Sequence, residues 1–189
     1  YPTTIFIIER KTSSPRGLEF FQTVYKNVFA TYSAALQEDN KMGMDYSRAK
    51  DWIVAERGFE PEHLGKCESI MCQGNGYLCL RNATDEFNPR EQRDLFVAGT
   101  FNKFDDNEVT ELPNAADVSR LEIKLDGQRF SLLTGTVEDY DRTLDLKTGE
   151  TVRKVVWKAP NGRRYELCFR RFVSMERLHV IGQKLCVRP

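Results

Sequence analysis

Three hairpin signals in the C-terminal half constrain the fold of this chain more than any other feature. Each is a short turn sequence flanked by segments in which apolar and polar residues alternate, the pattern of antiparallel strands with one buried face. The turns are Asp126-Gly127, residues 147–150 (Lys-Thr-Gly-Glu) and Pro160-Asn161-Gly162. A further apolar segment at 178–187 adds another strand. This many consecutive strands predict a mainly β protein built as an antiparallel β-sandwich.

The first 44 residues read as an extension of this domain. Residues 4–9 are β-branched and aromatic and favour a short strand, whereas apolar residues over 18–36 recur at helical spacing and predict an amphipathic helix. A polar, glycine-containing break follows at 37–44, with Met42 and Met44 beside it. We therefore expect a helical appendage over 1–44 and the main domain over 45–189, or else a strand and helix that pack on the domain as an integral part.

The segment between these parts carries weaker signals. Residues 45–56 favour a short helix or irregular lead-in around a buried Trp52, and 58–63 form a loop. Two apolar arms, at 69–72 and 77–80, flank a turn. Residues 83–94 are polar and contain Asn88-Pro89, which predicts an exposed loop, and 95–101 are apolar enough for a buried strand.

Charge and cysteine content exclude several classes of protein. Lys plus Arg and Asp plus Glu both number 28, so the balance gives no indication of nucleic-acid binding. No apolar run reaches the roughly eighteen residues of a membrane-spanning helix. The five cysteines lack the C-x-x-C spacing of zinc or redox motifs, and buried, reduced thiols are the expected state. This cysteine pattern predicts a cytoplasmic protein.

The titratable residues give no convincing catalytic set. Both histidines, His63 and His179, are expected to be structural. Glu68 and Glu111 occupy interesting neighbourhoods for a pair of acid and base carboxylates, but a structural role beside turns is the preferred interpretation. Basic pairs at 153–154, 163–164 and 170–171 suggest a phosphate patch. Alternation along strands splits such pairs between faces, so we interpret them as a solvated sheet face. No cofactor or metal motif is present.

The turn at Gly74-Asn75-Gly76-Tyr77 lies between the two apolar arms. Two glycines around an asparagine allow the backbone to adopt positive φ and to approach a neighbouring segment closely. Taken alone, this pattern is typical of many hairpins. Its position between apolar segments predicts a tight, packed turn.

Several motifs, taken in order, carry a resemblance to a known family. These runs are 52–69, 74–78 (Gly-Asn-Gly-Tyr-Leu), 96–99 (Phe-Val-Ala-Gly), 111–115 (Glu-Leu-Pro-Asn-Ala), 125–130 (Leu-Asp-Gly-Gln-Arg-Phe), 140–146 (Tyr-Asp-Arg-Thr-Leu-Asp-Leu) and 171–174 (Arg-Phe-Val-Ser). Together they resemble the N-terminal domain of glycoside hydrolase family 65, which contains maltose, trehalose and kojibiose phosphorylases and related hydrolases. The resemblance begins near Trp52 and leaves residues 1–44 outside. Cys79 and Asn82 stand where the family usually has glycines.

The resemblance implies a galactose-mutarotase-like super-sandwich, incomplete in this chain, that precedes an (α/α)6 barrel. In such enzymes inorganic phosphate is the co-substrate that displaces an α-linked glucose of a disaccharide, and a barrel glutamate is the general acid. We expect the 189 residues alone to be inactive, because the resemblance places the barrel and its glutamate outside them. The expected role is to support the barrel and the active-site rim, with the missing catalytic domain and a second copy as partners.

The rim role is assigned to six structural residues, and no catalytic, cofactor or metal residue is assigned. They are Gly74, Asn75, Gly76, Tyr77, Glu111 and Asn114. The alternative function is a stand-alone carbohydrate-binding or protein-interaction module on the same sandwich. Exposed aromatic residues in a groove favour that alternative, and a bare apolar patch favours the enzyme domain.

Overall fold

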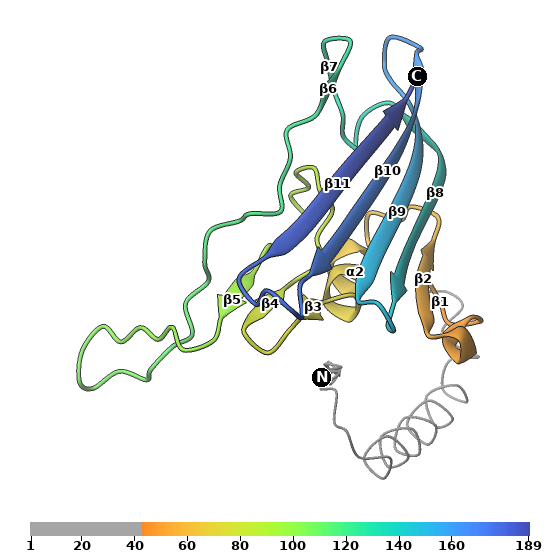
Figure 1. The fold of residues 1–189 in the computed structure, drawn as a ribbon. Helices are drawn as coiled ribbons and strands as arrows, with labels where there is room; N and C mark the ends of the chain where they lie inside the picture. The colour runs from red at the N-terminus through yellow and green to blue at the C-terminus, as the bar shows by residue number, and fades with distance from the viewer. Residues whose placement is uncertain (1–42) are drawn as a thin grey trace.

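A six-stranded antiparallel sheet dominates the structure, a computed structural model that describes residues 43–189. Its strands lie in the order β1-β2-β8-β9-β10-β11 (Figure 1). Their bounds are β1 Met44–Asp45, β2 Ile53–Arg57, β8 Thr136–Asp145, β9 Glu150–Lys158, β10 Arg164–Val173 and β11 Ile181–Arg188. The predicted segments within 1–42 lie outside the described residues, and the domain boundary near residue 44 stays a prediction.

The three predicted hairpins are confirmed. The Asp126-Gly127 turn joins β6 (Lys124–Leu125) to β7 (Gln128–Arg129), and both of its residues have positive φ, 48° and 76°. The other two turns join β8 to β9 and β9 to β10. Local turn chemistry and alternation thus determined the central strands, because connections of two, four and five residues admit few pairings.

A second, smaller sheet packs against one end of the large sheet. It contains β3 (Gln73–Gly74), β4 (Leu78–Leu80) and β5 (Leu95–Val97). Leu78, Leu80 and Leu95 form a buried cluster with Val173 at the end of β10. The helix α2 (Leu64–Ile70) precedes β3, and a 3-10 turn, η2 (Ala49–Asp51), precedes β2. The predicted mainly β, antiparallel, sandwich-like fold is confirmed, with two layers of unequal size.

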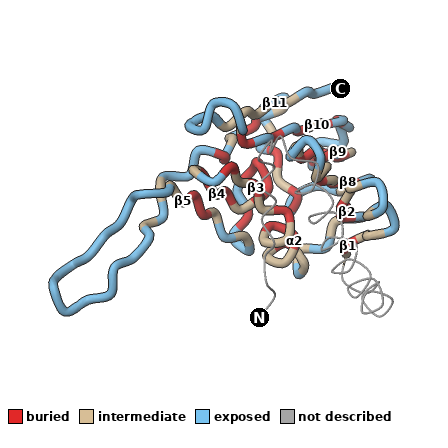
Figure 2. The backbone as a smooth tube through the Cα atoms, turned by 60° about the horizontal axis from the view of Figure 1, so that its bottom comes forward, coloured by how far each residue is buried: buried red, intermediate tan, exposed pale blue. Residues whose placement is uncertain are grey.

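The main core lies on the inner face of β8, β9 and β10. Every second residue of β10 is buried, as alternation requires. Trp157 is fully buried, and its ring meets Phe130 edge-on at 5.2 Å between centroids. Phe130 comes from the segment after β7, so the β6–β7 region covers this face. Figure 2 shows the buried residues gathered between the sheets and around α2.

Several predictions for individual segments are wrong. Residues 45–56 form two strands and a 3-10 turn, with a half-buried Trp52 at φ 67°. The apolar arm at 69–72 is the end of α2 and the residues after it. The buried strand predicted over 95–101 stops at Val97, and Phe101 is 68% exposed.

The predicted loop at 83–94 contains no helix or strand, but its predicted exposure is wrong, and this is the largest error. Ala83, Thr84, Asp85 and Glu86 are all nearly inaccessible to solvent. Polar composition suggested exposure, but these polar groups are paired with buried arginines of the large sheet. Burial of charged groups is tolerated only when they are paired and hydrogen-bonded in this way.

After β5 the chain leaves the body as a long arm. Residues 98–113 run outward and return, as Figure 1 and Figure 2 show, and their side chains are almost all exposed. One bridge, between Asn102 and Glu111, joins the two sides through backbone hydrogen bonds of 2.9 and 2.8 Å. The segment at 110–115 forms no strand, and its proline cannot donate a ladder hydrogen bond.

Candidate functional site

An apolar pocket of about 390 Å³ lies where the small sheet meets the β8–β9 turn. Its walls come from the end of α2, the small sheet, the base of the arm, the β8–β9 turn and the end of β10. One of the lining residues, Lys147, has a charged side chain. The apolar lining includes Ile70, Tyr77, Leu78, Phe96, Leu112, Leu144, Leu146, Val173 and Met175. Such a surface is suited to burying apolar groups and offers little for acid–base chemistry.

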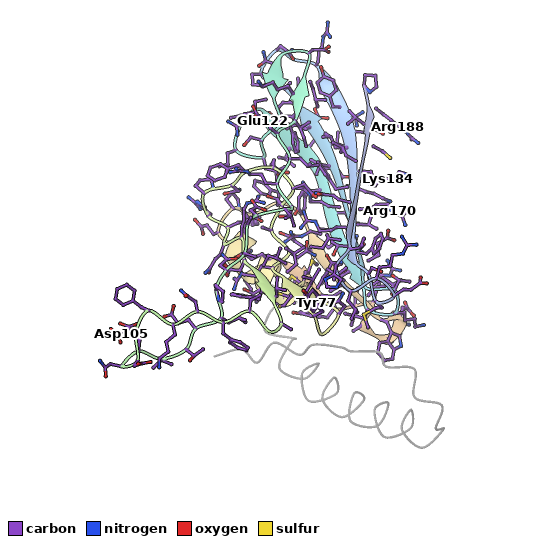
Figure 3. All side chains as sticks on the ribbon, turned by 60° about the vertical axis from the view of Figure 1, so that its left-hand side comes forward. Tyr77, Asp105, Glu122, Arg170, Lys184 and Arg188 are labelled. Carbon is purple, nitrogen blue, oxygen red and sulfur yellow. The ribbon has the colours of Figure 1, made fainter. Side chains whose placement is uncertain are left out.

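The turn at 74–77 builds one wall of this pocket. Gly74, Gly76 and Tyr77 line it, and Gly76 has φ 83°, in the left-handed region that favours glycine. The positive φ predicted for this turn is therefore present. Tyr77 meets His179 edge-on, with ring centroids 4.3 Å apart. Tyr77 lies at the base of the molecule, near the start of the arm (Figure 3).

Asn75 faces the protein instead of the pocket and holds the turn in place. Its Nδ2 donates to the carbonyls of Ser174 and Leu178 at 2.7 and 2.9 Å. Its Oδ1 accepts from the backbone N–H groups of Tyr77 and Leu78 at 2.9 and 2.7 Å. All four hydrogen-bonding positions of the amide are used, and the turn is fixed to the β10–β11 connection.

The two thiols in the pocket wall are unsuited to nucleophilic chemistry. Burial raises the pKa of Cys72 to about 11, with a further contribution from the nearby Cys79. Burial likewise raises the pKa of Cys79. Since the thiolate is the reactive form, both side chains behave here as small apolar groups, as the sequence predicted.

The other two rim residues lie apart from the turn. Glu111 is exposed on the arm, next to the pocket residue Leu112. Asn114 has a structural position, because its Oδ1 accepts from the N–H of Leu95 at 2.9 Å and its Nδ2 donates to Asp94 at 2.8 Å. These bonds fasten the returning side of the arm to β5. Only Gly74, Gly76 and Tyr77 of the six line the pocket directly.

Glu68 has a structural role as a buried, paired carboxylate. The carboxylate is 1% exposed, receives Arg81 at 2.9 Å and accepts from the N–H of Gln92. Burial raises the pKa of Glu68, although these hydrogen bonds and the charge of Arg81 oppose the rise. Glu111 is exposed on the arm, whereas Glu68 is buried and bound by Arg81 and the Gln92 N–H, so these two residues do not act as an acid and base pair here.

Three arginines lie on the inner face of the large sheet, and two of them, Arg153 and Arg171, were misread from the sequence. Arg142, Arg153 and Arg171 come from β8, β9 and β10, and each is at most 3% exposed. Arg153 binds both carboxylate oxygens of Glu86 at 2.8 and 2.5 Å, and its guanidinium lies 4.1 Å from the centre of the Phe169 ring. The interpretation of 153–154 and 170–171 as a solvated face is wrong for Arg153 and Arg171.

Asp85 lies between Arg153 and Arg171 and belongs to the same cluster of buried arginines and acids. Its carboxylate receives Arg171 at 2.6 Å and Arg153 at 3.1 Å. Burial alone would raise the pKa of Asp85, but the two guanidinium groups outweigh burial and hold it below its ordinary value. Because acids of the same chain already occupy these arginines, the cluster holds the 82–86 segment on the sheet and presents no free phosphate site.

Arg142, the third buried arginine, connects β2 to the 82–86 segment. Its Nε donates to Glu56 on β2 at 2.7 Å, and its Nη1 donates to the carbonyl of Asn82 at 3.0 Å. Tyr140 donates to the same Glu56 oxygen. The signal for this cluster was present in the sequence as arginines at inward positions of alternating strands, opposite an Asp-Glu pair, but strand register was needed to see it.

Residues 43–189 contain neither a membrane-spanning helix nor a cluster of metal-binding side chains. No helix in this part of the chain is long and apolar enough to cross a membrane. Within the same range, no group of three or more His, Cys, Asp or Glu side chains is arranged to hold a metal ion.

Comparison with known proteins assigns the fold to a family. Residues 54–189 match the family model described as glycosyl hydrolase family 65, N-terminal domain. A solved structure from the human microbiome, described as a candidate kojibiose phosphorylase, superposes with a TM-score of 0.68 at 20% sequence identity. The superposition covers 77% of this chain and 20% of that one, and it shows a shared fold.

Sequence relatives agree with this assignment. The chain is 46% identical over 140 residues to a kojibiose phosphorylase of Halothermothrix orenii, covering 74% of this chain and 18% of that protein. It is 38% identical to a kojibiose phosphorylase of Escherichia coli, covering 72% and 18%, and 28% identical to an alpha,alpha-trehalose phosphorylase of Thermoanaerobacter brockii, covering 74% and 20%. The chain spans about a fifth of the length of these relatives.

Proposed function

We propose that this chain, which belongs to the glycosyl hydrolase family 65 N-terminal domains, is the non-catalytic sandwich portion of an α-glucoside phosphorylase. Kojibiose and trehalose phosphorylases are among its relatives, and they match it only over about a fifth of their length. The substrate of the whole enzyme is an α-linked glucose disaccharide, with inorganic phosphate as co-substrate. Catalytic groups then belong to the remainder of the enzyme, and this domain supports them.

The apolar pocket beside the 74–77 turn is the observation that carries this proposal. A pocket of about 390 Å³ with one charged lining residue is well suited to receive apolar side chains from another part of the enzyme. Two of its lining residues, Leu112 and Met175, remain 45% and 46% exposed. Contact with the catalytic part would remove this apolar surface from water, which is the main favourable term in such packing.

The arm extends the same surface. It leaves the body beside Ala98 and returns beside Leu112, and both of these residues line the pocket. A partner docked in the pocket would therefore lie at the root of the arm, with Glu111 and the exposed Phe101 within the same region. This is how the turn and arm would shape the rim of an active site without performing chemistry.

Phosphorolysis by the full-length protein tests the proposal. We expect glucose 1-phosphate to be released from kojibiose or trehalose only when phosphate is present, and the 189-residue chain alone to release none. Water-dependent release of glucose without glucose 1-phosphate would make the protein a hydrolase. Activity of the isolated chain would contradict the non-catalytic role.

A carbohydrate-binding module is the second candidate function. Phe101 and Phe104 on the arm are 68% and 87% exposed, and exposed aromatic rings can stack on sugars. These rings lie on a projecting arm and outside the residues that line the pocket, which makes this function weaker than the first. Calorimetric titration of the isolated chain with kojibiose, maltose and trehalose distinguishes the two, since the first function predicts no binding.

We further propose a cytoplasmic location and a homodimer for the complete enzyme. The location is supported by the five unpaired cysteines. Sedimentation of the full-length protein would measure the oligomeric state, and a monomer at all concentrations would contradict the dimer.

A further inference from the structure

We propose that Cys168 and Cys186 form an oxidisable dithiol site that reacts with small anionic disulfides, such as oxidised glutathione, and closes into a cross-strand disulfide. The disulfide would fasten the edge strand β11 to β10. This inference concerns the outer face of the large sheet and is independent of the proposed function.

Strand register carries the inference. Cys168 on β10 and Cys186 on β11 are direct partners in the antiparallel pairing, so their side chains lie on the same face of the sheet. Both thiols are free. Seventeen residues lie between them in sequence, and only the register of β10 with β11 brings them together.

The backbone spacing at this pair is compatible with a disulfide. In the same register, the N–H of Ser174 donates to the carbonyl of Val180 at 2.9 Å, which marks a hydrogen-bonded pair. Hydrogen-bonded pairs recur at every second residue, so Cys168 and Cys186 form one, with a Cα separation of about 5.5 Å. Disulfides span Cα separations of roughly 4.4–6.8 Å. The pair can therefore close in this register when the two Cβ atoms approach from about 5.5 Å to about 4 Å.

The surroundings are accessible and cationic. Cys186 is exposed and Cys168 is half-buried. Arg170 interacts electrostatically with both thiols, and Lys154 is the β9 partner of Cys168. Figure 3 shows Arg170, Lys184 and Arg188 on the outer side of the sheet, away from the loops that cover its inner face. Arg170 is itself bound to Glu150.

The lysines and Arg188 on this face select the class of reactant. Lys154, Lys184 and Arg188 have no ion pair within the described part of the chain, so their charge is available to an incoming anion. Glu166 is the nearest acid on β10 and is bound by Arg164. Oxidised glutathione carries carboxylates that these cations attract. A small anionic disulfide is thus favoured over a neutral one.

The remaining cysteines differ in their surroundings. Burial raises the pKa of Cys67 to about 12 and that of Cys72 to about 11. Thiols held in the protonated form inside the protein react slowly with disulfides. Cys72 and Cys79 are also near each other, which makes them an internal comparison for Cys168 and Cys186.

The reaction has two exchange steps. The Cys186 thiolate, the more exposed, attacks one sulfur of oxidised glutathione, forms a mixed disulfide and releases one glutathione thiolate. The Cys168 thiolate then attacks the Cys186 sulfur, forms the Cys168–Cys186 bond and releases the second glutathione thiolate. Two protein thiols are oxidised, one glutathione disulfide is reduced to two thiols, and the two protons pass to the buffer or to glutathione.

Mass spectrometry tests the site directly. The 189-residue chain is incubated with oxidised glutathione, free thiols are alkylated, and the protein is cleaved with trypsin. Cleavage after Arg164, Arg170 and Lys184 places the two cysteines in separate peptides, 165–170 and 185–189. We expect these peptides to be joined by a disulfide in the wild-type chain and in the control Cys79→Ser, and never in Cys186→Ser.

A stability measurement tests whether the disulfide stabilises the pairing of β11 with β10. We expect the urea midpoint of the oxidised wild-type chain to exceed that of the reduced chain, and Cys186→Ser to show no such increase, because a cross-link restricts the unfolded chain. A persistent glutathione adduct on Cys186, a disulfide at Cys72 and Cys79 instead, or a link only between two chains would overturn the site. A Cys168–Cys186 disulfide that leaves the urea midpoint unchanged would overturn the proposed stabilisation of β11.

Discussion

At the scale of single residues, Asn75 decides how the 74–77 turn is held. Its amide satisfies two carbonyls of the β10–β11 connection and two N–H groups of its own turn while only 6% exposed. A buried amide with every donor and acceptor paired fixes one geometry, because any other leaves polar groups unpaired. The pocket wall therefore depends on an amide that does not itself touch the pocket.

Replacing Asn75 tests this role. We expect Asn75→Ala to lower the free energy of unfolding by about 3 kcal/mol, since it leaves buried backbone groups without partners. Asn75→Asp should be at least as damaging, because a carboxylate oxygen would face two carbonyls. The control Asn161→Ala removes one exposed turn hydrogen bond and should cost less than about 1 kcal/mol. Urea denaturation measures all three, and equal effects would contradict the role of Asn75.

Gly76 provides a second residue-scale prediction. Its φ of 83° is unfavourable for β-branched residues, so Gly76→Val should cost about 1–3 kcal/mol of stability. Gly76→Asn should cost less, since asparagine tolerates the left-handed region better. Thermal unfolding compares the variants, and a Val variant as stable as the wild type would remove the argument from positive φ.

Residue-scale predictions from sequence succeeded where the signal is local. The positive φ of the 74–77 turn follows from glycine chemistry within four residues. The burial of Arg153 and Arg171 could not be read in this way, because their partners Asp85 and Glu86 lie about seventy to eighty-five residues away in sequence. An arginine followed by a second basic residue gives no indication of which of the two faces inward.

At the scale of elements, the 82–86 segment joins β2, β8, β9 and β10 through buried charge. Arg142 and Arg153 are direct partners across β8 and β9, and Arg171 lies on β10 beside them. Asn82, Asp85 and Glu86 meet these arginines from the covering segment. Such a cluster specifies one placement of the covering segment, because a displaced segment would leave buried guanidinium groups unpaired.

The cluster predicts a particular acid sensitivity. Asp85 has a folded pKa below its ordinary value of 3.8, so its stabilising contribution is complete above about pH 4 and is lost as pH falls through the folded pKa. Asp85→Asn should cost about 3–5 kcal/mol at pH 7, because it removes a charge that two buried arginines require. The cost should shrink as pH falls below about 4, because the unfolded wild-type chain then binds a proton at Asp85 that the folded chain does not.

Urea midpoints between pH 7 and pH 3 measure this effect. The control is Asp126→Asn at an exposed carboxylate, whose pKa is also lowered, by hydrogen bonds from Tyr165 and Arg163. Solvent screens that interaction, so its replacement should change the midpoint little at any pH. A cost for Asp85→Asn that stays constant down to pH 3 would contradict the assignment.

Helices and strands were likewise predicted correctly where the signal is local in sequence and wrongly where it depends on distant residues. The hairpins of β6 to β10 were predicted because turn and alternation lie within about twenty residues of each other. The 83–94 segment was mispredicted because polar residues usually indicate solvent, and only the inner arginines of distant strands reverse that inference. In the small sheet only β5 was predicted as a strand, because the two- and three-residue strands β3 and β4 carry no periodicity.

At the scale of the whole molecule, the pocket and the arm form one incomplete surface. The large sheet covers its inner face with loops of this chain, but the pocket at its lower end keeps apolar walls open to solvent. Family membership supplies a reason, since the relatives are about five times as long as the matched part. The proposed partner of this surface is the remainder of the enzyme.

A matched pair of substitutions tests this assignment in the full-length enzyme. Leu112 lines the pocket and Leu133 does not, although they are similarly exposed at 45% and 47%. We expect Leu112→Ser to lower phosphorolysis and the thermal midpoint, since it places a hydroxyl in an apolar contact. Leu133→Ser should change neither. Equal effects of the two substitutions would mean that Leu112 is as free of partners as Leu133.

Amide hydrogen exchange over residues 74–79 shows whether the rest of the enzyme covers this pocket wall, because it compares the wall in the isolated chain and in the complete protein. The measurement follows these amides in the isolated chain and in the full-length protein under the same conditions. The account predicts markedly slower exchange in the full-length protein, while the exposed Asn161-Gly162 turn exchanges equally fast in both. Equal exchange over 74–79 in the two proteins would contradict it.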